Sequence, residues 1–151
     1  MKIFHTLFLL LSALTLVGCE FTITTGDEDD QDELHWVIEE SHADLTINPK
    51  QKYRVTITGS HNRVTLAPDV TELVVTGSDN YIEFGDDYIG EVFVTGSSNN
   101  LDGNNLAVGN IDVTGNHNLI SIESYKELLD TGDNNQVAAM VLNGQEQQLI
   151  Q

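Results

Sequence analysis

The stretch Leu73-Val74-Val75-Thr76-Gly77-Ser78-Asp79-Asn80-Tyr81-Ile82-Glu83-Phe84 decides the fold, because its pattern recurs along the chain. Each copy has Thr-Gly, two variable residues, Asn, one further residue and an apolar side chain, and four more copies occupy 55–66, 92–103, 111–122 and 128–139. The glycines stand at positions 59, 77, 96, 115 and 132, so successive copies are 17 to 19 residues apart. A period this short and constant predicts a solenoid of stacked coils.

Apolar residues at alternate positions flank each glycine, which predicts two short strands per coil with one face turned inward. They stand four and two positions before the glycine and five and seven positions after it, and a further column seven positions before it predicts a third wall. In that order the columns are Val55, Leu73, Val92, Ile111 and Leu128; Ile57, Val75, Val94, Val113 and Asp130; Val64, Ile82, Leu101, Ile120 and Val137; Leu66, Phe84, Gly103, Ile122 and Ala139; and, in the third wall, Lys52, Val70, Ile89, Val108 and Tyr125.

Antiparallel hairpins joined by Gly-rich turns are the alternative to stacked coils. We favour parallel coils, because only they require a constant repeat that places each residue about 4.8 Å from its equivalent in the next turn. The predicted fold is therefore an all-β parallel β-solenoid of about six coils of 17 to 19 residues, with its handedness left open.

The corner of each coil repeats Gly-x-x-Asn, and we expect glycine to supply backbone angles that other residues reach only with strain. Asparagine tolerates the left-handed region and can bond to backbone near a turn. Stacked in register, the asparagines should form an amide ladder, and the threonines before the glycines should form an outward stripe. The ladder is Asn62, Asn80, Asn99, Asn118 and Asn135, and the stripe is Thr58, Thr76, Thr95, Thr114 and Thr131.

A sixth, degenerate copy at 36–47 precedes the five, with Glu40 in place of the glycine and Ala43 in place of the asparagine. Terminal repeats of solenoids are usually atypical because they cap an open core. We therefore expect Trp36 to act as a lid, and 140–142 to close the other end of the stack.

Residues 1–18 have the layout of a secretory signal peptide, with Lys2, a mostly apolar run and small residues at the cut. Leu16-Val17-Gly18-Cys19 resembles the lipobox of bacterial lipoproteins, in which the cysteine is lipidated and becomes the new N-terminus. A plain secreted protein and a transmembrane anchor are the alternatives, although the apolar run is short for a span. By the same resemblance, Glu20 after the cysteine favours the outer membrane over the inner membrane of the cell envelope.

Residues 19–34 are rich in acids and poor in apolar side chains, so we predict a solvated tether before a solenoid domain at 35–151 with capping ends. The whole chain carries 24 acidic and six basic residues, for a net charge of −18. Nucleic acid is therefore excluded as a partner, because its recognition requires a basic surface. The expected partners are the membrane, through the lipid anchor, and an envelope protein or glycan.

No motif for nucleophilic catalysis, phosphate binding or cofactor binding stands out, so we expect no enzymatic activity and no cofactor. Adjacent acids at Asp86-Asp87 are read as a solvated turn. In register, His42, His61 and Asp79 would share one edge and could hold zinc or copper, although an exposed polar turn explains them as well. Ice binding by the threonine stripe is disfavoured, because its companion column is Thr56, Val74, Phe93, Asp112 and Leu129.

The serial Gly-Ser-x-Asn units after a lipobox resemble an uncharacterised bacterial family, domain of unknown function 3060, over about 55–137. The resemblance implies a β-solenoid and brings no activity with it. We expect a non-enzymatic, membrane-anchored envelope lipoprotein, built as a rigid acidic structural or interaction module. The alternative is a ligand-binding module for a glycan or divalent metal on one face, for which Tyr81 and Phe93 are the outward aromatic candidates.

Overall fold

A computed structural model describes residues 22–25, 33–85, 87–142 and 145–146, and these ranges contain strands, turns and no helix. The predicted signal peptide at 1–18, Cys19 and most of the predicted tether lie outside the described residues. The strands are β1 (Thr22–Thr25), β2 (Leu34–Ile38), β3 (Asp44–Ile47), β4 (Tyr53–Ile57), β5 (Arg63–Leu66), β6 (Val70–Val75), β7 (Tyr81–Phe84), β8 (Tyr88–Val94), β9 (Asn100–Val113), β10 (Leu119–Asp130), β11 (Gln136–Leu142) and β12 (Gln145–Glu146).

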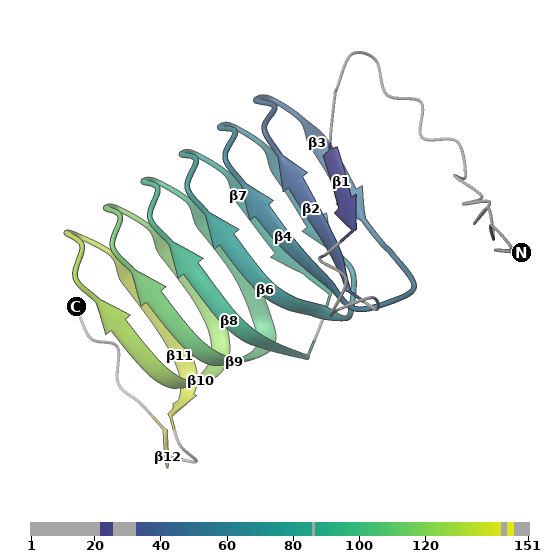
Figure 1. The fold of residues 1–151 in the computed structure, drawn as a ribbon. Helices are drawn as coiled ribbons and strands as arrows, with labels where there is room; N and C mark the ends of the chain where they lie inside the picture. The colour runs from purple at the N-terminus through teal and green to yellow at the C-terminus, as the bar shows by residue number, and fades with distance from the viewer. Residues whose placement is uncertain (1–21, 26–32, 86, 143–144, 147–151) are drawn as a thin grey trace, which may run out of the picture.

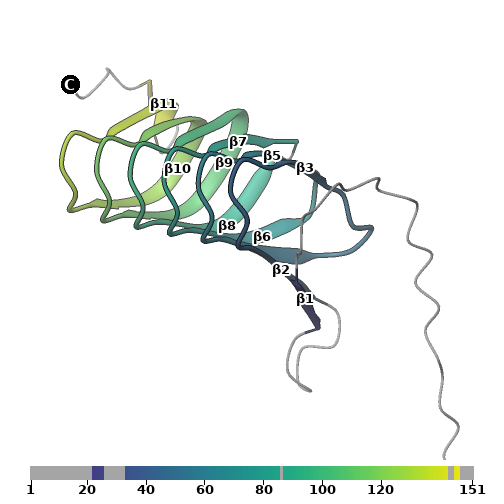
Figure 2. The same cartoon turned by 90° about the horizontal axis from the view of Figure 1, so that it is seen from above.

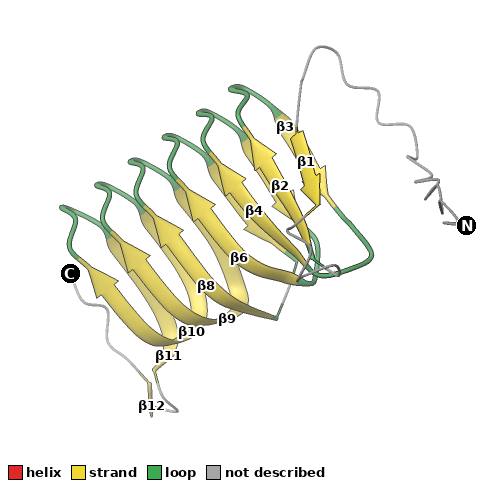
Figure 3. Cartoon of the chain, in the orientation of Figure 1, coloured by secondary structure: helices red, strands yellow, loops and turns green. Residues whose placement is uncertain are grey.

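The predicted parallel β-solenoid of about six coils is confirmed, and Figures 1 and 2 show the coils stacked from the first, blue coil to the last, yellow one. Two walls meet at the Gly-x-x-Asn corner. Wall A precedes the glycines and contains β2, β4, β6 and the ends of β8, β9 and β10. Wall B follows the asparagines and contains β3, β5, β7 and the starts of β9, β10 and β11. The corners align along one edge of the stack (Figure 3).

The register between coils is the one that the repeat predicts. Val55 pairs with Leu73 and Leu73 with Val92 in wall A, while Val64 pairs with Ile82 in wall B. The alternation of the sequence therefore becomes an alternation of burial, as in β4 and β5. One core of aliphatic side chains runs through the stack, and its members from Val55 to Val113 in wall A are at most 2% exposed. Removal of apolar surface from water, as in this core, is the main favourable term in the free energy of folding.

The third wall is present, but its first member differs from the prediction. Tyr53, not Lys52, pairs with Val70, and an irregularity in the register follows before Arg54 pairs with Glu72. Tyr53 is fully buried and its hydroxyl donates a hydrogen bond to the Ala67 carbonyl at 2.6 Å, whereas Lys52 is exposed. Counting positions from the glycine missed this, because a bulge shifts the count by one residue on one side of the bulge.

The two ends of the stack are each bordered by a short antiparallel strand. β1 pairs with β2 at the first coil, and β12 pairs with the end of β11 at the last. The predicted tether is therefore wrong for 22–25, which form a strand, and for Leu34, which begins β2. Trp36 packs half-buried against the core in the first coil, where a lid was expected.

The corner glycines are required for a reason that differs from the predicted one. Their backbone angles are not in the left-handed region, so conformational freedom does not select them. Instead, a Cβ atom built on Gly59, Gly77, Gly96, Gly115 or Gly132 would lie 1.6 to 1.8 Å from the carbonyl oxygen of the residue one coil earlier. Only a residue without Cβ permits this approach of one backbone to another.

We predict that Gly96→Ala lowers the free energy of unfolding by about 3 kcal/mol, because its Cβ forces two coils apart. Urea denaturation followed by far-UV circular dichroism measures the effect. Gly90→Ala is the matched control, since its Cβ meets only the Thr71 carbonyl oxygen, at 3.1 Å. Equal stability of the two variants would contradict the steric explanation.

Candidate functional site

The corner asparagines form a continuous buried ladder of hydrogen bonds, the most extensive polar feature of the described structure. Asn62, Asn80, Asn99 and Asn118 are 1 to 2% exposed. From Asn80 onward, each side-chain amide donates to the Oδ1 atom of the asparagine in the next coil, at 3.1 to 3.2 Å. Buried side-chain amides are costly unless satisfied, so this edge of the fold depends on an unbroken ladder.

Each asparagine also connects two coils through backbone groups. Asn99 Nδ2 donates to the Gly77 carbonyl at 3.0 Å, and Asn99 Oδ1 accepts the backbone N–H of Asn80 at 3.0 Å. The glycine carbonyl that approaches the next coil so closely is thus the acceptor for the asparagine of that same next coil. Glycine and asparagine therefore solve one problem together: the first permits close stacking, and the second satisfies the carbonyl that close stacking buries.

The left-handed residue of each corner is the one before the asparagine, not the asparagine itself as expected. These residues have φ between 57° and 64°. Non-glycine residues adopt this region at a cost, and polar residues such as Asn, Asp and His adopt it most readily. The column is His42, His61, Asp79, Ser98, His117 and Asn134.

A second ladder, which the sequence analysis missed, lies beside the first at the residue after each glycine. The backbone N–H of Ser60 donates to Ser41 Oγ at 3.0 Å, and that of Ser78 donates to Ser60 Oγ at 3.1 Å. The same link continues to Asp133, whose N–H donates to Asn116 Oδ1 at 2.8 Å. The sequence signal was present, because this column contains only Ser, Asn and Asp.

The three residues considered for a metal are neighbours, but they are not arranged as ligands. The rings of His42 and His61 stack at 4.8 Å with an angle of 5° between their planes, and His61 Nε2 lies 3.8 Å from Asp79 Oδ2. Parallel stacked rings direct their nitrogen lone pairs along parallel planes, so the lone pairs do not converge on one ion. Among the described residues, no group of three or more His, Cys, Asp or Glu side chains could hold a metal ion.

The predicted threonine stripe is exposed along the whole stack. Its companion column in wall A, from Thr56 to Leu129, mixes polar, aliphatic, aromatic and acidic side chains, and Leu129 is 55% exposed. Phe93 in that column is half-buried and faces outward beside the stripe. This face therefore offers a flat surface of mixed polarity and no repeated two-column array.

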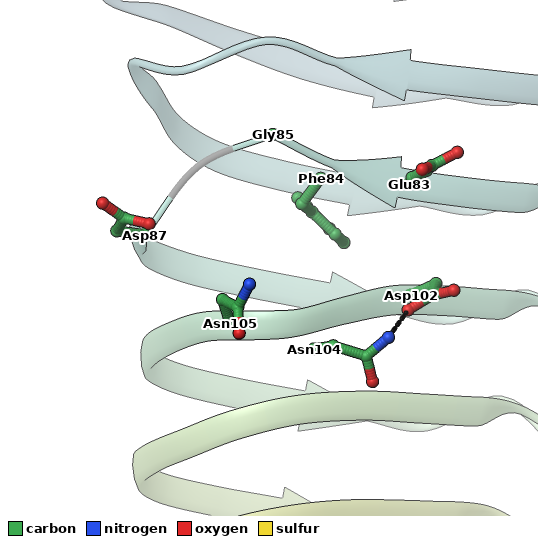
Figure 4. A pocket seen from close by; sticks show the side chains of 7 residues that line it. All are labelled: Glu83, Phe84, Gly85, Asp87, Asp102, Asn104 and Asn105. Atoms are coloured by element: carbon green, nitrogen blue, oxygen red, sulfur yellow. Dashed lines mark hydrogen bonds between the residues drawn. The ribbon is translucent and has the colours of Figure 1, made fainter.

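An open pocket of about 280 Å³ lies where wall B turns toward the third wall, between the coil that contains Asn80 and the coil that contains Asn99. Its lining is rich in carboxylates and amides: Glu83, Phe84, Gly85, Asp87, Asp102, Asn104 and Asn105. Figure 4 shows Asp87 at the opposite end of the pocket from Glu83 and Asp102. Such a pocket can accept hydrogen bonds from hydroxyl or ammonium groups. Asp86, the other acid of the predicted turn, lies outside the described residues.

A network on wall B already occupies two of these carboxylates. Asp102 Oδ2 accepts the Tyr81 hydroxyl at 3.0 Å, and Asp102 Oδ1 accepts Asn104 Nδ2 at 2.8 Å. The Arg63 guanidinium lies 4.5 Å from the centroid of the Tyr81 ring and 3.6 Å from Glu83 Oε2. Ion pairs this exposed add little stability, so the network chiefly orients side chains across three coils.

The pKa of Tyr81 is raised above its ordinary value, first because its hydroxyl donates to Asp102. Partial burial and the negative charges of Asp102 and Glu83 act in the same direction, and Arg63 opposes them. A neutral phenol is thereby favoured in the folded state.

The asparagine ladder gives the sharpest stability prediction. Asn99→Ala should lower the free energy of unfolding by at least about 3 kcal/mol, because it leaves the Gly77 carbonyl and the backbone N–H of Asn80 buried without their partners and removes one acceptor of the Asn80 amide. Urea denaturation measures this loss. Asn110→Ala, on the exposed side of β9, should cost less than about 0.5 kcal/mol. A loss at Asn99 as small as that at Asn110 would show that the ladder is dispensable.

The Tyr81 network predicts a dependence on pH. Because the folded-state pKa is raised, the stability that Tyr81 contributes is present below its ordinary pKa of about 10 and declines as the pH rises through the folded value. Asp102→Asn should lower the pKa of Tyr81, as measured by ultraviolet titration of phenolate absorbance, with Tyr81→Phe identifying its share of the signal. An unchanged titration in Asp102→Asn would contradict the assignment.

No helix in the described part of the chain has the length and apolar character needed to cross a membrane. Comparison with protein-family models, curated proteins and solved structures gives no match to this chain. The likeness to domain of unknown function 3060 therefore stays a resemblance of the repeat.

Proposed function

We propose that this protein is a non-enzymatic lipoprotein of the bacterial cell envelope, a rigid acidic module displayed from a membrane by a lipid on Cys19. The unbroken asparagine ladder supports the proposal that the module is rigid, because it joins successive corners without an insertion between them. The lipobox-like Leu16-Val17-Gly18-Cys19 supports the anchor, and Glu20 supports outer-membrane sorting by resemblance.

The geometry suits a spacer or docking module better than a catalyst. Coils of 17 to 19 residues provide no long loops to build a deep cleft, and the pocket beside Asp102 is open. A stack of six coils at about 4.8 Å per coil is roughly 30 Å long, with flat walls. The net charge of −18 favours a cationic partner over an anionic one.

Ligand binding on wall B is the second candidate, and the pocket is the observation that favours it. A glycan could use the Phe84 and Tyr81 rings together with the carboxylates and amides around them. We rank it second because both oxygens of Asp102 already accept hydrogen bonds from Tyr81 and Asn104, and Arg63 covers one face of the Tyr81 ring.

The anchor is tested by expressing the full chain in a bacterial host that is fed radiolabelled palmitate. We expect label on the protein and recovery of the protein in the membrane fraction. Cys19→Ser should abolish the label, because the thiol is the only acceptor of its kind in the chain. Label that persists in Cys19→Ser would contradict the proposal.

A further inference from the structure

The first and last coils break the corner pattern at three positions, and each break changes what could stack on that end. Glu40 replaces the corner glycine and Ala43 replaces the corner asparagine in the first coil, while Asp130 replaces an inward aliphatic residue in the last. We propose that these residues, with strands β1 and β12, block a second copy of this chain from stacking head to tail on the solenoid. This inference stands apart from the proposed lipid anchor, because it concerns only the two ends of the fold.

Without such a block, the ends would invite a second copy. Among the described strands, β3 pairs only with β5, the 128–130 part of β10 pairs only with β9, and the 136–139 part of β11 pairs only with β10. Each unpaired edge has the same repeat geometry as the coil that would meet it. Exposed parallel edges of this kind are templates for further pairing.

Glu40 blocks the first coil by its Cβ atom. In every later coil, a Cβ at the glycine position would lie 1.6 to 1.8 Å from the carbonyl oxygen of the preceding coil. Glu40 is tolerated because no described coil precedes it. If the first coil of one copy stacked in register on the last coil of another, the Cβ of Glu40 would meet the Gly132 carbonyl at that same distance.

Ala43 lacks the side-chain amide that would hydrogen-bond to the preceding coil and stabilise such stacking. The carbonyls of Glu40, Gly59, Gly77, Gly96 and Gly115 each accept an asparagine Nδ2 atom at 2.8 to 3.0 Å. An incoming first coil presents Ala43 where the corner asparagine stands in the other coils. The Gly132 carbonyl would therefore find no amide donor in the incoming coil, although burial would require one.

Asp130 ends the ladder from within its own coil. Its Oδ1 atom accepts Asn135 Nδ2 at 2.9 Å and the Gly132 N–H at 3.1 Å. Elsewhere in the stack, this amide donates to the Oδ1 atom of the asparagine in the following coil. In the last coil, Asp130 Oδ1 is the acceptor instead. The equivalent residues Ile57, Val75, Val94 and Val113 are fully buried, so a docked copy would bury a carboxylate among aliphatic side chains. Burying an unpaired charge is strongly unfavourable.

Strand β1 occupies the remaining edge of the first coil, and strand β12 occupies that of the last coil. β1 pairs antiparallel with β2 through Thr22–Thr25, and β12 pairs antiparallel with Val141 and Leu142 of β11. Wall A of the last coil of another copy would need that same edge of β2. A second copy would therefore have to displace β1 before it met Glu40.

Two complementary variants of the full-length chain test the proposal by sedimentation velocity in detergent. The first opens the first coil with Ile23→Pro, Glu40→Gly and Ala43→Asn, and the second opens the last coil with Asp130→Val and Gln145→Pro. Each alone should be a monomer, because its partner end remains blocked. Their mixture should form dimers of twice the mass, and a chain with all five substitutions should form longer rods that electron microscopy can resolve.

Matched controls carry substitutions on outward positions of the same strands and corners. Glu39→Gly with Ile23→Pro replaces the first variant, and Glu127→Val with Gln145→Pro replaces the second; both acids are exposed. The control mixture should stay monomeric. The proposal is overturned if the wild-type chain itself forms rods, if the control mixture dimerises as readily, or if the complementary variants keep the wild-type circular dichroism and do not dimerise when mixed.

Discussion

The approach of one corner backbone to the next is the contact on which this fold depends. A carbonyl oxygen of one coil lies where the Cβ of the next corner residue would otherwise be, so that residue must be glycine. The same carbonyl is then too enclosed for water to satisfy it, and an asparagine amide supplies the donor. Steric and hydrogen-bonding requirements thus select two residues of the repeat jointly.

Everything inside the stack follows from that contact, and the outward positions are left free. With the corners locked, wall A and wall B repeat in register and bury a continuous aliphatic column. The outward columns bear no such constraint, which is why Val74, Phe93 and Asp112 can succeed one another at one position. The side chains of those outward columns determine the surface chemistry of the solenoid, and any specificity for a partner would depend on them. The function we propose therefore uses the solenoid as a stiff support for a variable surface.

The repeat predicts the features that every coil shares. It does not predict a bulge within one coil or a side-chain contact between particular residues. The inward columns could be predicted because equivalent residues are one period apart. The period places Lys52 in the third wall, where the structure has Tyr53, because counting residues does not detect a bulge. The pattern also does not distinguish the asparagine from the residue before it, which has the left-handed conformation, because polar residues at both positions favour turns. The serine ladder and the Tyr81–Asp102 bond were missed, because each depends on side-chain direction between coils.

By itself the sequence determined that the chain is a stack of equivalent coils and which side chains face inward. Periodicity carries that information, because residues at the same place in a repeat must share one environment. Only the tertiary structure decided why the corner requires glycine, how the amide ladder is satisfied, and how Glu40 and Asp130 end it. Those features depend on distances between backbones of adjacent coils, and a linear pattern does not contain such distances.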